Sequence, residues 1–333
     1  MCFTFHYIYW CLMKKIINRN TVSAFLYYTG TLYLFGIIKK KFGYNKALVF
    51  TGHRIINHPE NKIDIMSLLS GQGITDVELN KRLYSIKRFY FPGDPKDLGQ
   101  SILKDGCFYV TFDDGYNDNI KHAKPVLDFH DIKSVIFVVS HILNNPTINP
   151  WWDKYGEEEL VKNKSTSIAK KRYLIRCGEK KSRTQGLLID GDDKDAQETT
   201  TCNYFDVGQL YVDDDTFYYA NHTSTHANLV NLTDADLNKE LSDCMELIKK
   251  SPRYLPLLAY PFGAYNKKVL DKVQSMSEFS LAFATGGGQS KSKYDIKRIN
   301  LNTHPYHLFY AELVDVFTFI NWARTKFRKL IKL

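Results

Sequence analysis

Two adjacent carboxylates, Asp113 and Asp114, close an apolar segment and are followed directly by Gly115. Neighbouring side chains on a strand point to opposite faces, so both carboxylates reach one pocket only if the backbone turns between them or just after them. Gly115 permits such a turn. A paired acid at the end of a strand suits a site in which one carboxylate holds a metal ion and the other moves a proton. The alternative is a surface turn built from Asp and Gly.

Two histidines, His222 and His226, lie four residues apart in the segment His-Thr-Ser-Thr-His. That spacing puts both imidazoles on one face of a helical turn or at the mouth of a compact loop. With one aspartate they would supply three nitrogen and oxygen ligands and leave coordination positions open, as in a catalytic site for a divalent cation such as zinc. A histidine pair alone is weak support, because structural histidines are commoner than ligands.

A third segment, Ala259-Tyr260-Pro261-Phe262-Gly263, by itself predicts only a strand that ends in a turn. In this order and with these separations, the three segments resemble the polysaccharide deacetylases of carbohydrate esterase family 4, which share a NodB-type homology domain. The resemblance covers roughly residues 47–301. It includes His53-Arg54-Ile55 after the first apolar segment and Trp151-Trp152-Asp153 after the third.

The resemblance implies a role for each matching residue. Asp113 would be the general base, and Asp114, His222 and His226 would bind one divalent metal ion. Zinc is favoured, with cobalt and nickel as alternatives. The backbone N–H of Phe262 would stabilise the oxyanion. Substrate contacts are implied for Trp152, Tyr260 and Pro261.

These roles together describe the hydrolysis of an acetylated sugar. Asp113 would take a proton from a metal-activated water, which attacks the acetamide carbonyl and releases acetate and an amine. The expected substrate is an acetylated glycan or a lipid-linked sugar. The same groups would also hydrolyse an O-acetyl ester, so the sequence leaves amide and ester open.

Two positions depart from the family pattern. Many members have an arginine two residues before the motif proline that orients the base, and this chain has Ala259 there. Arg298, on a late apolar segment, is predicted to reach the same carboxylate, the alternative being an ordinary surface cation. No segment matches the late Leu-x-His motif of the general acid, and His304 is the candidate although its context differs. A catalytically impaired carbohydrate-binding or scaffold protein on the same fold is therefore a second interpretation.

The elements that must position these residues alternate between strand and helix. Helical patterns at 119–130, 234–250 and 267–276 lie between apolar segments, and Thr233 is placed as the N-cap of the second helix. This alternation predicts a parallel sheet. The resemblance narrows it to an irregular (β/α)7 barrel of the polysaccharide deacetylase type, with its site at the carboxyl ends of the strands. The predicted strands are 47–51, 107–112, 134–140, 217–220, 257–260, 281–285 and 296–301.

Composition indicates one large domain, at 46–310, with appendages. The 333 residues are 44% hydrophobic and 14% aromatic, which is enough for a full core. A polar stretch near 157–201 is predicted to be an exposed, partly disordered insertion. No zinc-finger spacing, phosphate-binding loop or RNA-binding motif accompanies the net charge of +9, so nucleic acid is not a predicted partner. The six cysteines contain no CxxC pair and decide neither compartment nor redox state.

The composition of both terminal segments indicates contact with a membrane. Residues 21–38 are almost uncharged and flanked by lysines, with a length at the lower edge of a bilayer span. A spanning helix, an interfacial helix and a helix packed on the domain are alternatives for the 1–45 segment. The 311–333 segment mixes apolar and basic residues, as in a helix that lies on anionic lipid or on the barrel surface.

These termini predict a membrane-associated protein, without determining the side of the membrane or the oligomeric state. Met13, followed by two lysines, is an alternative first residue. The segment shows no obvious small-residue cleavage site, so a removed signal peptide is not the predicted arrangement. A membrane-interaction protein in which the barrel is incidental is a third interpretation.

Overall fold

The computed structural model describes residues 18–181, 203–286 and 290–331, which form two compact units. The larger unit consists of Lys46–Lys87 and Phe91–Asn302. The smaller unit consists of the described parts of Met1–Asn45, Arg88–Tyr90 and Thr303–Leu333. The main domain therefore ends at residue 302 rather than at the predicted 310, because the helix that follows packs with the terminal helices.

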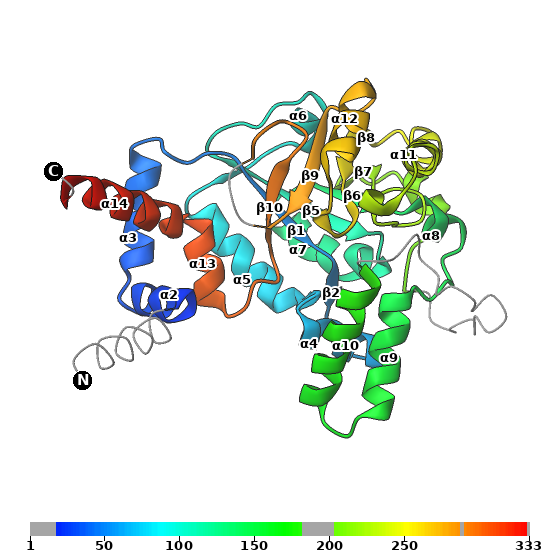
Figure 1. Cartoon of the computed structure of the whole chain (residues 1–333), viewed down its shortest axis with the longest axis horizontal. Helices are drawn as coiled ribbons and strands as arrows, with labels where there is room; N and C mark the ends of the chain where they lie inside the picture. The colour runs from blue at the N-terminus through cyan, green and yellow to red at the C-terminus, as the bar shows by residue number, and fades with distance from the viewer. Residues whose placement is uncertain (1–17, 182–202, 287–289, 332–333) are drawn as a thin grey trace. The chain divides into compact units, whose positions relative to one another are not determined.

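The larger unit is built around a closed barrel of parallel strands (Figure 1). Strand β1 pairs with β5 on one side and with β10 on the other, which closes the ring. The predicted (β/α)7 barrel is confirmed, and each predicted strand overlaps one that is observed. Within the described residues the ring consists, in order, of β1 (Leu48–Gly52), β5 (Cys107–Asp114), β6 (Ser134–Val138), β7 (Phe217–Asn221), β8 (Tyr254–Ala259), β9 (Leu281–Thr285) and β10 (Ile296–Asn300).

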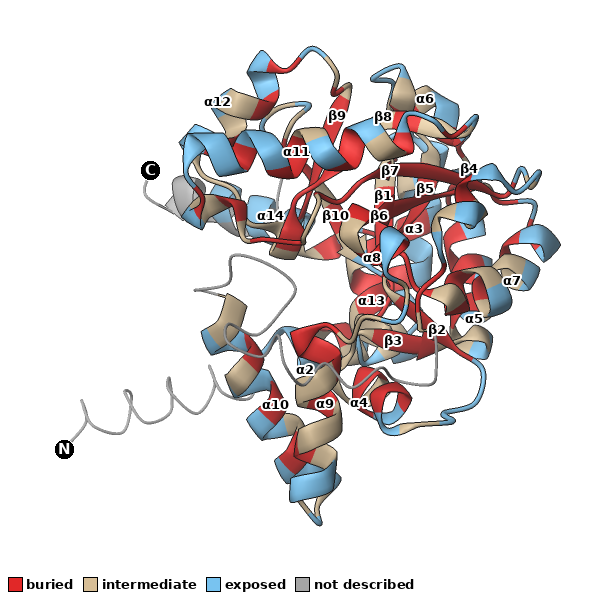
Figure 2. Ribbon diagram, turned by 90° about the vertical axis from the view of Figure 1, so that its right-hand side faces the viewer, coloured by how far each residue is buried: buried red, intermediate tan, exposed pale blue. Residues whose placement is uncertain are grey.

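Burial on both faces explains why most of these strands are continuous apolar runs. Strand β10 differs, because buried Ile296 and Arg298 alternate with the less buried Lys297 and Ile299. All five residues of β6 are buried, for example, and Figure 2 shows the buried colour along the barrel strands. Two further pairings lie outside the ring. Strand β4 (Phe91–Pro92) pairs with the start of β5, and β2 (Arg54–Ile56) pairs with β3 (Gly73–Thr75) in a separate sheet.

Helices cover the outside of the barrel. The predicted cap of the 234–250 helix is confirmed, because the Thr233 side chain accepts a hydrogen bond from the Asp236 N–H. The predicted 119–130 helix begins as a π-turn, η1 (Asn119–Ala123), and Pro125 lies where the α-helical part begins. The other helices and turns of this unit near the barrel are α4 (Lys62–Ser70), α5 (Asp76–Lys87), α6 (Pro95–Gly99), α7 (Lys124–Phe129), α8 (Ser140–Asn144), η2 (Val207–Tyr211), η3 (Leu229–Asn231), α11 (Asp234–Ile248), η4 (Pro261–Gly263) and α12 (Lys267–Ser275).

The polar insertion forms a pair of packed helices where it is described, α9 (Trp151–Lys162) and α10 (Thr166–Lys181) (Figure 1). Although the sequence of α10 is mostly polar, every fourth residue on one side of the helix is buried, namely Ala169, Tyr173 and Cys177. The stretch was predicted to be exposed and partly disordered, and its described part, up to residue 181, is instead ordered and packs three side chains. The remainder of the predicted insertion lies outside the described residues.

The smaller unit contains α2 (Arg19–Tyr28), α3 (Thr31–Lys41), α13 (Tyr306–Leu313) and α14 (Val316–Ile331). The apolar 21–38 segment is not one straight helix, because α2 and α3 meet at 81°. Gly30 lies at the break with a φ of 75°, which glycine adopts readily. Among the described residues, only this bent pair has the combined length and composition of a membrane span, and no single helix has both.

Candidate metal and catalytic site

The three sequence motifs meet at the carboxyl ends of neighbouring strands. Asp113 and Asp114 are the last two residues of β5, and η4 begins two residues after the end of β8. The strand register brings the histidine motif to the same level, because Asp114 pairs with Val138 of β6 and Val138 pairs with Asn221 at the end of β7. This is the end at which barrels of alternating strands and helices carry their sites.

Asp114, His222 and His226 form a buried cluster with the donor set of a metal site. One ligand atom from each lies within 4.8 Å of the others. Nε2 of His222 is 3.5 Å from Oδ1 of Asp114, and Nε2 of His226 is 3.4 Å from that oxygen. Atoms that share one ion at about 2.1 Å with tetrahedral angles lie about 3.4 Å apart. Oδ1 of Asp114 is buried without a hydrogen-bond partner, which a cation would supply, so these residues fit a bound divalent metal.

Backbone strain is concentrated at this cluster. Asp114, Thr223, His226 and Phe262 have φ values of 75°, 71°, 55° and 59°. They are four of the seven non-glycine residues with positive φ in the described chain. Such conformations are unfavourable for side-chain-bearing residues and persist where the surrounding structure holds a functional geometry. The turn that lets two adjacent carboxylates serve one pocket begins at Asp114 itself and continues at Gly115, whose φ is 84°.

Hydrogen bonds orient the two imidazoles. Nδ1 of His222 donates to the carbonyl oxygen of Ala259 at 2.8 Å, which leaves Nε2 as the ligand atom. The loop to the second histidine is held by the side chain of Asn221, which accepts from the Thr223 N–H at 2.7 Å. The Thr223 hydroxyl then accepts from the His226 N–H at 3.1 Å.

Glu240 of α11 fixes the same loop from behind, and sequence reasoning missed it. Its carboxylate accepts from the Thr225 N–H at 2.8 Å and from the Thr225 hydroxyl at 2.6 Å. Its backbone carbonyl accepts from the Ser224 N–H at 3.0 Å. Because the carboxylate holds the loop midway between the two histidines, it sets their separation.

Glu240→Ala is expected to weaken metal binding roughly tenfold, which is the scale of effects for groups that orient metal ligands. The hydrogen bonds to Thr225 would be lost, while all three ligands would remain. Isothermal titration of the metal-free protein with Zn²⁺ measures the change. Glu246→Ala, an exposed position on the same helix, is the matched control. Equal Zn²⁺ affinity in wild type and Glu240→Ala would show that the loop needs no such support.

Asp113 is held by Arg298 of β10, and the contact predicted between them is present. Nη1 of Arg298 lies 2.7 Å from Oδ1 of Asp113, and Nη2 lies 2.7 Å from Oδ2, so the pair is bidentate. Thr51 donates to Oδ2 at 3.3 Å. Because β1 pairs with both β5 and β10, barrel closure brings the guanidinium to the Asp113 carboxylate, although Ala259 occupies the usual arginine position.

The protonation states of the cluster follow from burial and from the opposite charges around it. Burial alone would raise the pKa of Asp113, but Arg298 outweighs it and lowers that pKa below its ordinary value. Burial is likewise outweighed at Asp114, whose pKa is lowered by His222 and His226. Burial lowers the pKa of His226 to about 3, whereas the carboxylates overcome burial at His222 and raise its pKa. Both acids are therefore ionised at neutral pH, and His226 is neutral as a metal ligand must be.

His53 is a further candidate that sequence reasoning named only as part of the resemblance. It follows β1 directly, and its Nε2 lies 4.0 Å from Oδ2 of Asp113. Its side chain is 26% exposed, so the imidazole reaches both the base and the solvent side of the site. A histidine one residue past a barrel strand was the available signal. His304, the predicted general acid, belongs to the smaller unit, so its role stays a prediction.

The residues predicted to contact the substrate, Trp152, Tyr260 and Pro261, are buried in the structure. Trp152 and Tyr260 are only 5% and 1% exposed, and Pro261 is also buried. Trp152 donates its Nε1–H to the Tyr116 hydroxyl at 2.9 Å, and its ring lies 4.9 Å from that of His226. The Tyr260 hydroxyl donates to the backbone carbonyl of residue 294. Tight packing makes these side chains supports of the site, not exposed surfaces for a sugar ring.

Phe262 lies against the metal cluster, with its ring 4.6 Å from the ring of His226. It is the second residue of η4, where a backbone N–H has no acceptor inside the turn. The turn depends on Gly263, whose φ is 66° and where an added Cβ would lie 2.6 Å from the backbone nitrogen of Thr285. The oxyanion role of the Phe262 N–H stays a prediction.

A second buried network links the Trp-Trp-Asp segment to the site. Arg54 contacts Asp64 and Asp118, each at 2.8 Å. Tyr204 donates to Asp153 at 2.8 Å, and burial raises the pKa of Asp153 to about 6 despite the charge of Arg54. These groups anchor the start of α9 behind the metal ligands, which explains why acidic residues are buried there.

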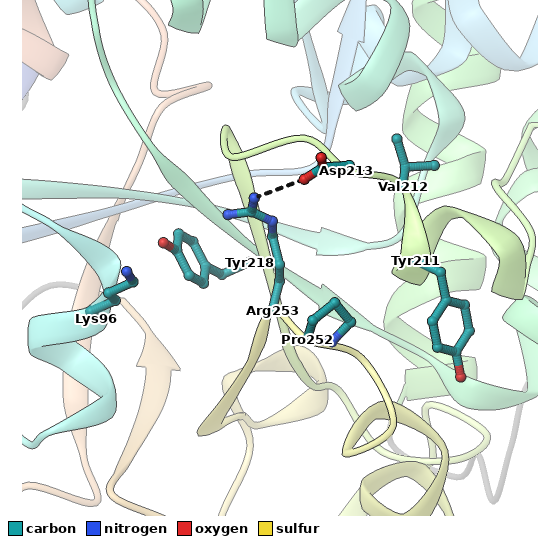
Figure 3. A pocket seen from close by; sticks show the side chains of 7 residues that line it. All are labelled: Lys96, Tyr211, Val212, Asp213, Tyr218, Pro252 and Arg253. Atoms are coloured by element: carbon teal, nitrogen blue, oxygen red, sulfur yellow. Dashed lines mark ion pairs between the residues drawn. The ribbon is translucent and has the colours of Figure 1, made fainter.

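The acidic run 213–215 belongs to a turn that precedes β7. Asp214 accepts from the Thr216 N–H at 2.9 Å. Asp213 lies 3.7 Å from Arg253, beside a pocket of about 450 Å³ (Figure 3). This pocket is lined by residues that precede or begin β7 and β8, such as Tyr218 and Arg253, so it lies at the amino ends of the strands. It is separate from the metal cluster.

Comparison with known proteins gives a consistent assignment. The profile of the family described as polysaccharide deacetylase matches residues 101–169 and 203–277. The gap in this match contains most of α10. YxkH of Bacillus subtilis (strain 168), provisionally named a polysaccharide deacetylase, is 22% identical over 217 residues, which are 62% of this chain. The chain spans 58% of the length of that curated relative.

Two solved structures share the fold. BC0361, a polysaccharide deacetylase from Bacillus cereus, gives a TM-score of 0.52 at 16% identity, covering 81% of this chain and 69% of that one. IcaB from Ammonifex degensii gives a TM-score of 0.51 at 16% identity, covering 81% of this chain and 97% of that one. At this level of identity the structural likeness supports the barrel fold.

Proposed function

Because the chain belongs to the polysaccharide deacetylase family, we propose that it is a metal-dependent hydrolase that removes N-acetyl groups from a glycan or a lipid-linked sugar. One observation carries the proposal. An Arg298-bound carboxylate and a buried group of Asp114, His222 and His226 lie together at one end of the barrel. This combination supplies an ionised base beside a place for a divalent cation.

The metal would be held by one carboxylate oxygen of Asp114 and by two imidazole nitrogens, a donor set that suits zinc and also cobalt or nickel. When bound there, a divalent cation supplies Lewis acidity for the acetyl carbonyl and for the attacking water. The orphaned Oδ1 of Asp114 supports its presence. Which of these metals is bound can be determined by measuring the metal content of the purified protein.

Asp113 accepts the proton of the attacking water. Its bidentate bond to Arg298 fixes the direction of the carboxylate and keeps it ionised. The Phe262 N–H donates a hydrogen bond to the oxygen that becomes negative when the carbonyl carbon is attacked. Since only the backbone takes part, a phenylalanine serves at this position.

We propose His53, rather than His304, as the group that gives a proton to the leaving nitrogen. Its Nε2 lies 4.0 Å from Asp113, and its partial exposure places the imidazole where a bound sugar amide would meet it. Proton donation completes the reaction, because the carbon–nitrogen bond breaks to give acetate and a neutral amine.

The impaired-scaffold interpretation depended on a missing arginine and on a missing late histidine. Arg298 makes the bidentate contact from another strand, which removes the first of these two arguments. An O-acetyl esterase remains the alternative, since the same base and oxyanion donor would act on an ester.

Acetate release from N-acetylglucosamine oligomers, peptidoglycan, lipid-linked sugars and an O-acetylated glycan tests the proposal. We expect release from at least one N-acetylated substrate, loss of activity with a chelator, and recovery with Zn²⁺, Co²⁺ or Ni²⁺. His53→Gln is expected to lower kcat by roughly 10²-fold without changing metal content. Release from the ester alone would establish the esterase instead. No release from any substrate by protein with full metal content would contradict catalysis.

A further inference from the structure

The excess of positive over negative charge in this protein lies in its smaller unit. The sequence assigned to that unit contains twelve Lys and Arg residues but only two Asp and Glu residues. The larger unit contains 33 Lys and Arg residues against 34 Asp and Glu residues, so it is close to neutral. The net charge of +9 therefore says nothing about the barrel or its substrate. It points to an anionic partner of the terminal helices.

Helix α3 is apolar on two sides, and only one of them is packed. Its inner side carries Leu32 and Gly36, both buried. An added Cβ at Gly36 would lie 2.6 Å from the ring of Phe89, which shows how close that packing is. Its outer side carries Tyr33, Leu34, Ile37 and Ile38, which are 44%, 58%, 40% and 45% exposed. A helix that is hydrophobic all round normally has an apolar environment on both sides.

The neighbouring helices extend this exposed apolar surface. Phe25 and Tyr28 of α2 are 67% and 80% exposed. Phe319 and Trp322 of α14 are 48% and 57% exposed. Phe319 also packs its ring 5.1 Å from that of Phe35, which joins α14 to α3. We define the terminal apolar surface as the outer side of α3 together with these four residues of α2 and α14.

Cations border the terminal apolar surface. Lys39, Lys40 and Lys41 end α3, directly after Ile37 and Ile38. The Lys39 and Lys40 ammonium groups also bond to backbone carbonyls inside the unit, so their positions are fixed. Apolar side chains beside a cluster of lysines, with aromatic rings between them, form the pattern of a surface that inserts at the level of lipid headgroups.

We propose that the smaller unit binds the surface of an anionic lipid bilayer, with the terminal apolar surface inserted at the boundary between headgroups and acyl chains. Helix α3 has 11 residues, which span about 16 Å, whereas the hydrocarbon core is about 30 Å thick. The 81° bend turns α2 away from the α3 axis, so the pair lies in the surface and does not cross it. A second copy of the chain would bring the same positive charge to the contact, which opposes self-association through this surface.

Sedimentation of the full chain with vesicles tests the proposal. We expect binding to phosphatidylcholine vesicles that contain one third phosphatidylglycerol, and at least tenfold weaker binding to pure phosphatidylcholine or in high salt. Leu34→Ser with Ile38→Ser is expected to weaken binding to the anionic vesicles roughly tenfold or more. Val77→Ser on α5 and Val161→Ser on α9, at positions of the larger unit that are 71% and 66% exposed, are the matched controls and should bind like wild type.

A fluorescence experiment locates the contact. Trp151 and Trp152 are 1% and 5% exposed, and Trp10 lies outside the described residues. We therefore replace Trp10 by phenylalanine. Among the described residues, Trp322 is then the exposed tryptophan whose fluorescence reports contact with lipid. Its emission should shift to shorter wavelength on anionic vesicles and be quenched by lipids brominated near the headgroup.

Four outcomes would overturn the proposal. Equal binding to neutral and anionic vesicles would remove the electrostatic part, and an unshifted Trp322 would remove the insertion. Binding that resists alkaline carbonate would indicate a span. Concentration-dependent dimers lost in Leu34→Ser with Ile38→Ser, without vesicle binding, would identify a second copy as the partner. Because vesicle binding is measured without substrate, its failure leaves the proposed hydrolase untouched, and the reverse also holds.

Discussion

Asp113→Asn is expected to lower kcat for acetate release by about 10²-fold to 10⁴-fold while the protein keeps its metal. The amide cannot accept the proton of the attacking water, but the three proposed ligands are unchanged. Asp114→Ala is expected to lose metal and activity together, since it removes one of those ligands. Metal content by mass spectrometry, measured beside acetate release, separates the two neighbours.

The two variants check each other, because they alter adjacent residues of β5 that are both buried. Circular dichroism and thermal unfolding of each variant control for misfolding. Asp113→Asn that lost its metal, or Asp114→Ala that kept it, would show that the division of labour between the carboxylates is reversed. Full activity in either variant would place the chemistry elsewhere.

Arg298→Leu is expected to destabilise the barrel by about 3–5 kcal/mol, because it leaves the Asp113 carboxylate buried without its partner. The leucine variant should also raise the Asp113 pKa, since Arg298 is what outweighs burial there. The acidic limb of the pH profile of kcat/KM should therefore move to higher pH. Chemical denaturation and pH-rate profiles measure the two effects.

The sign of the pH effect on stability follows from the same pair. The pKa of Asp113 is lower in the folded protein than its ordinary value, so the pair stabilises fully above that ordinary value. The stabilisation is lost as the pH falls through the folded pKa. Arg298→Leu should flatten this acid dependence.

The double variant Asp113→Asn with Arg298→Leu gives a sharper test of coupling. Removing both buried charges should restore much of the stability lost in the single arginine variant. Arg298→Lys keeps a positive charge but cannot make the bidentate contact, so it should be intermediate. Additive losses in the double variant would mean that the two side chains stabilise the barrel independently.

Local patterns were sufficient to predict the barrel strands. Most of the strands are short apolar runs buried on both faces, and such runs are read from neighbouring residues alone. The same patterning did not reveal helix α10, where charged residues separate the buried residues that recur at every fourth position. It also extended one helix across Gly30, where the backbone bends by 81°.

The candidate ligands were predicted because their spacing and their places after strands carry the signal. Asp114 and His222 are far apart in the chain, yet Asp114 ends β5 and His222 directly follows β7, and both strands pair with β6. Once a parallel barrel is expected, the carboxyl ends of its strands must meet. The burial of Trp152 and Tyr260, in contrast, depends on packing partners that no local pattern specifies.

The sequence by itself determined the seven strands, the acid pair and the histidine pair, because strand ends and residue spacing are local properties. Only the tertiary structure decided which cation holds Asp113 and which imidazole lies beside it. Arg298 is 185 residues away in sequence, and its contact exists because β1 closes the ring between β5 and β10. Closure sets distances through space that spacing along the chain does not encode, which is why the guanidinium, His53 and Glu240 took their places only in the folded protein.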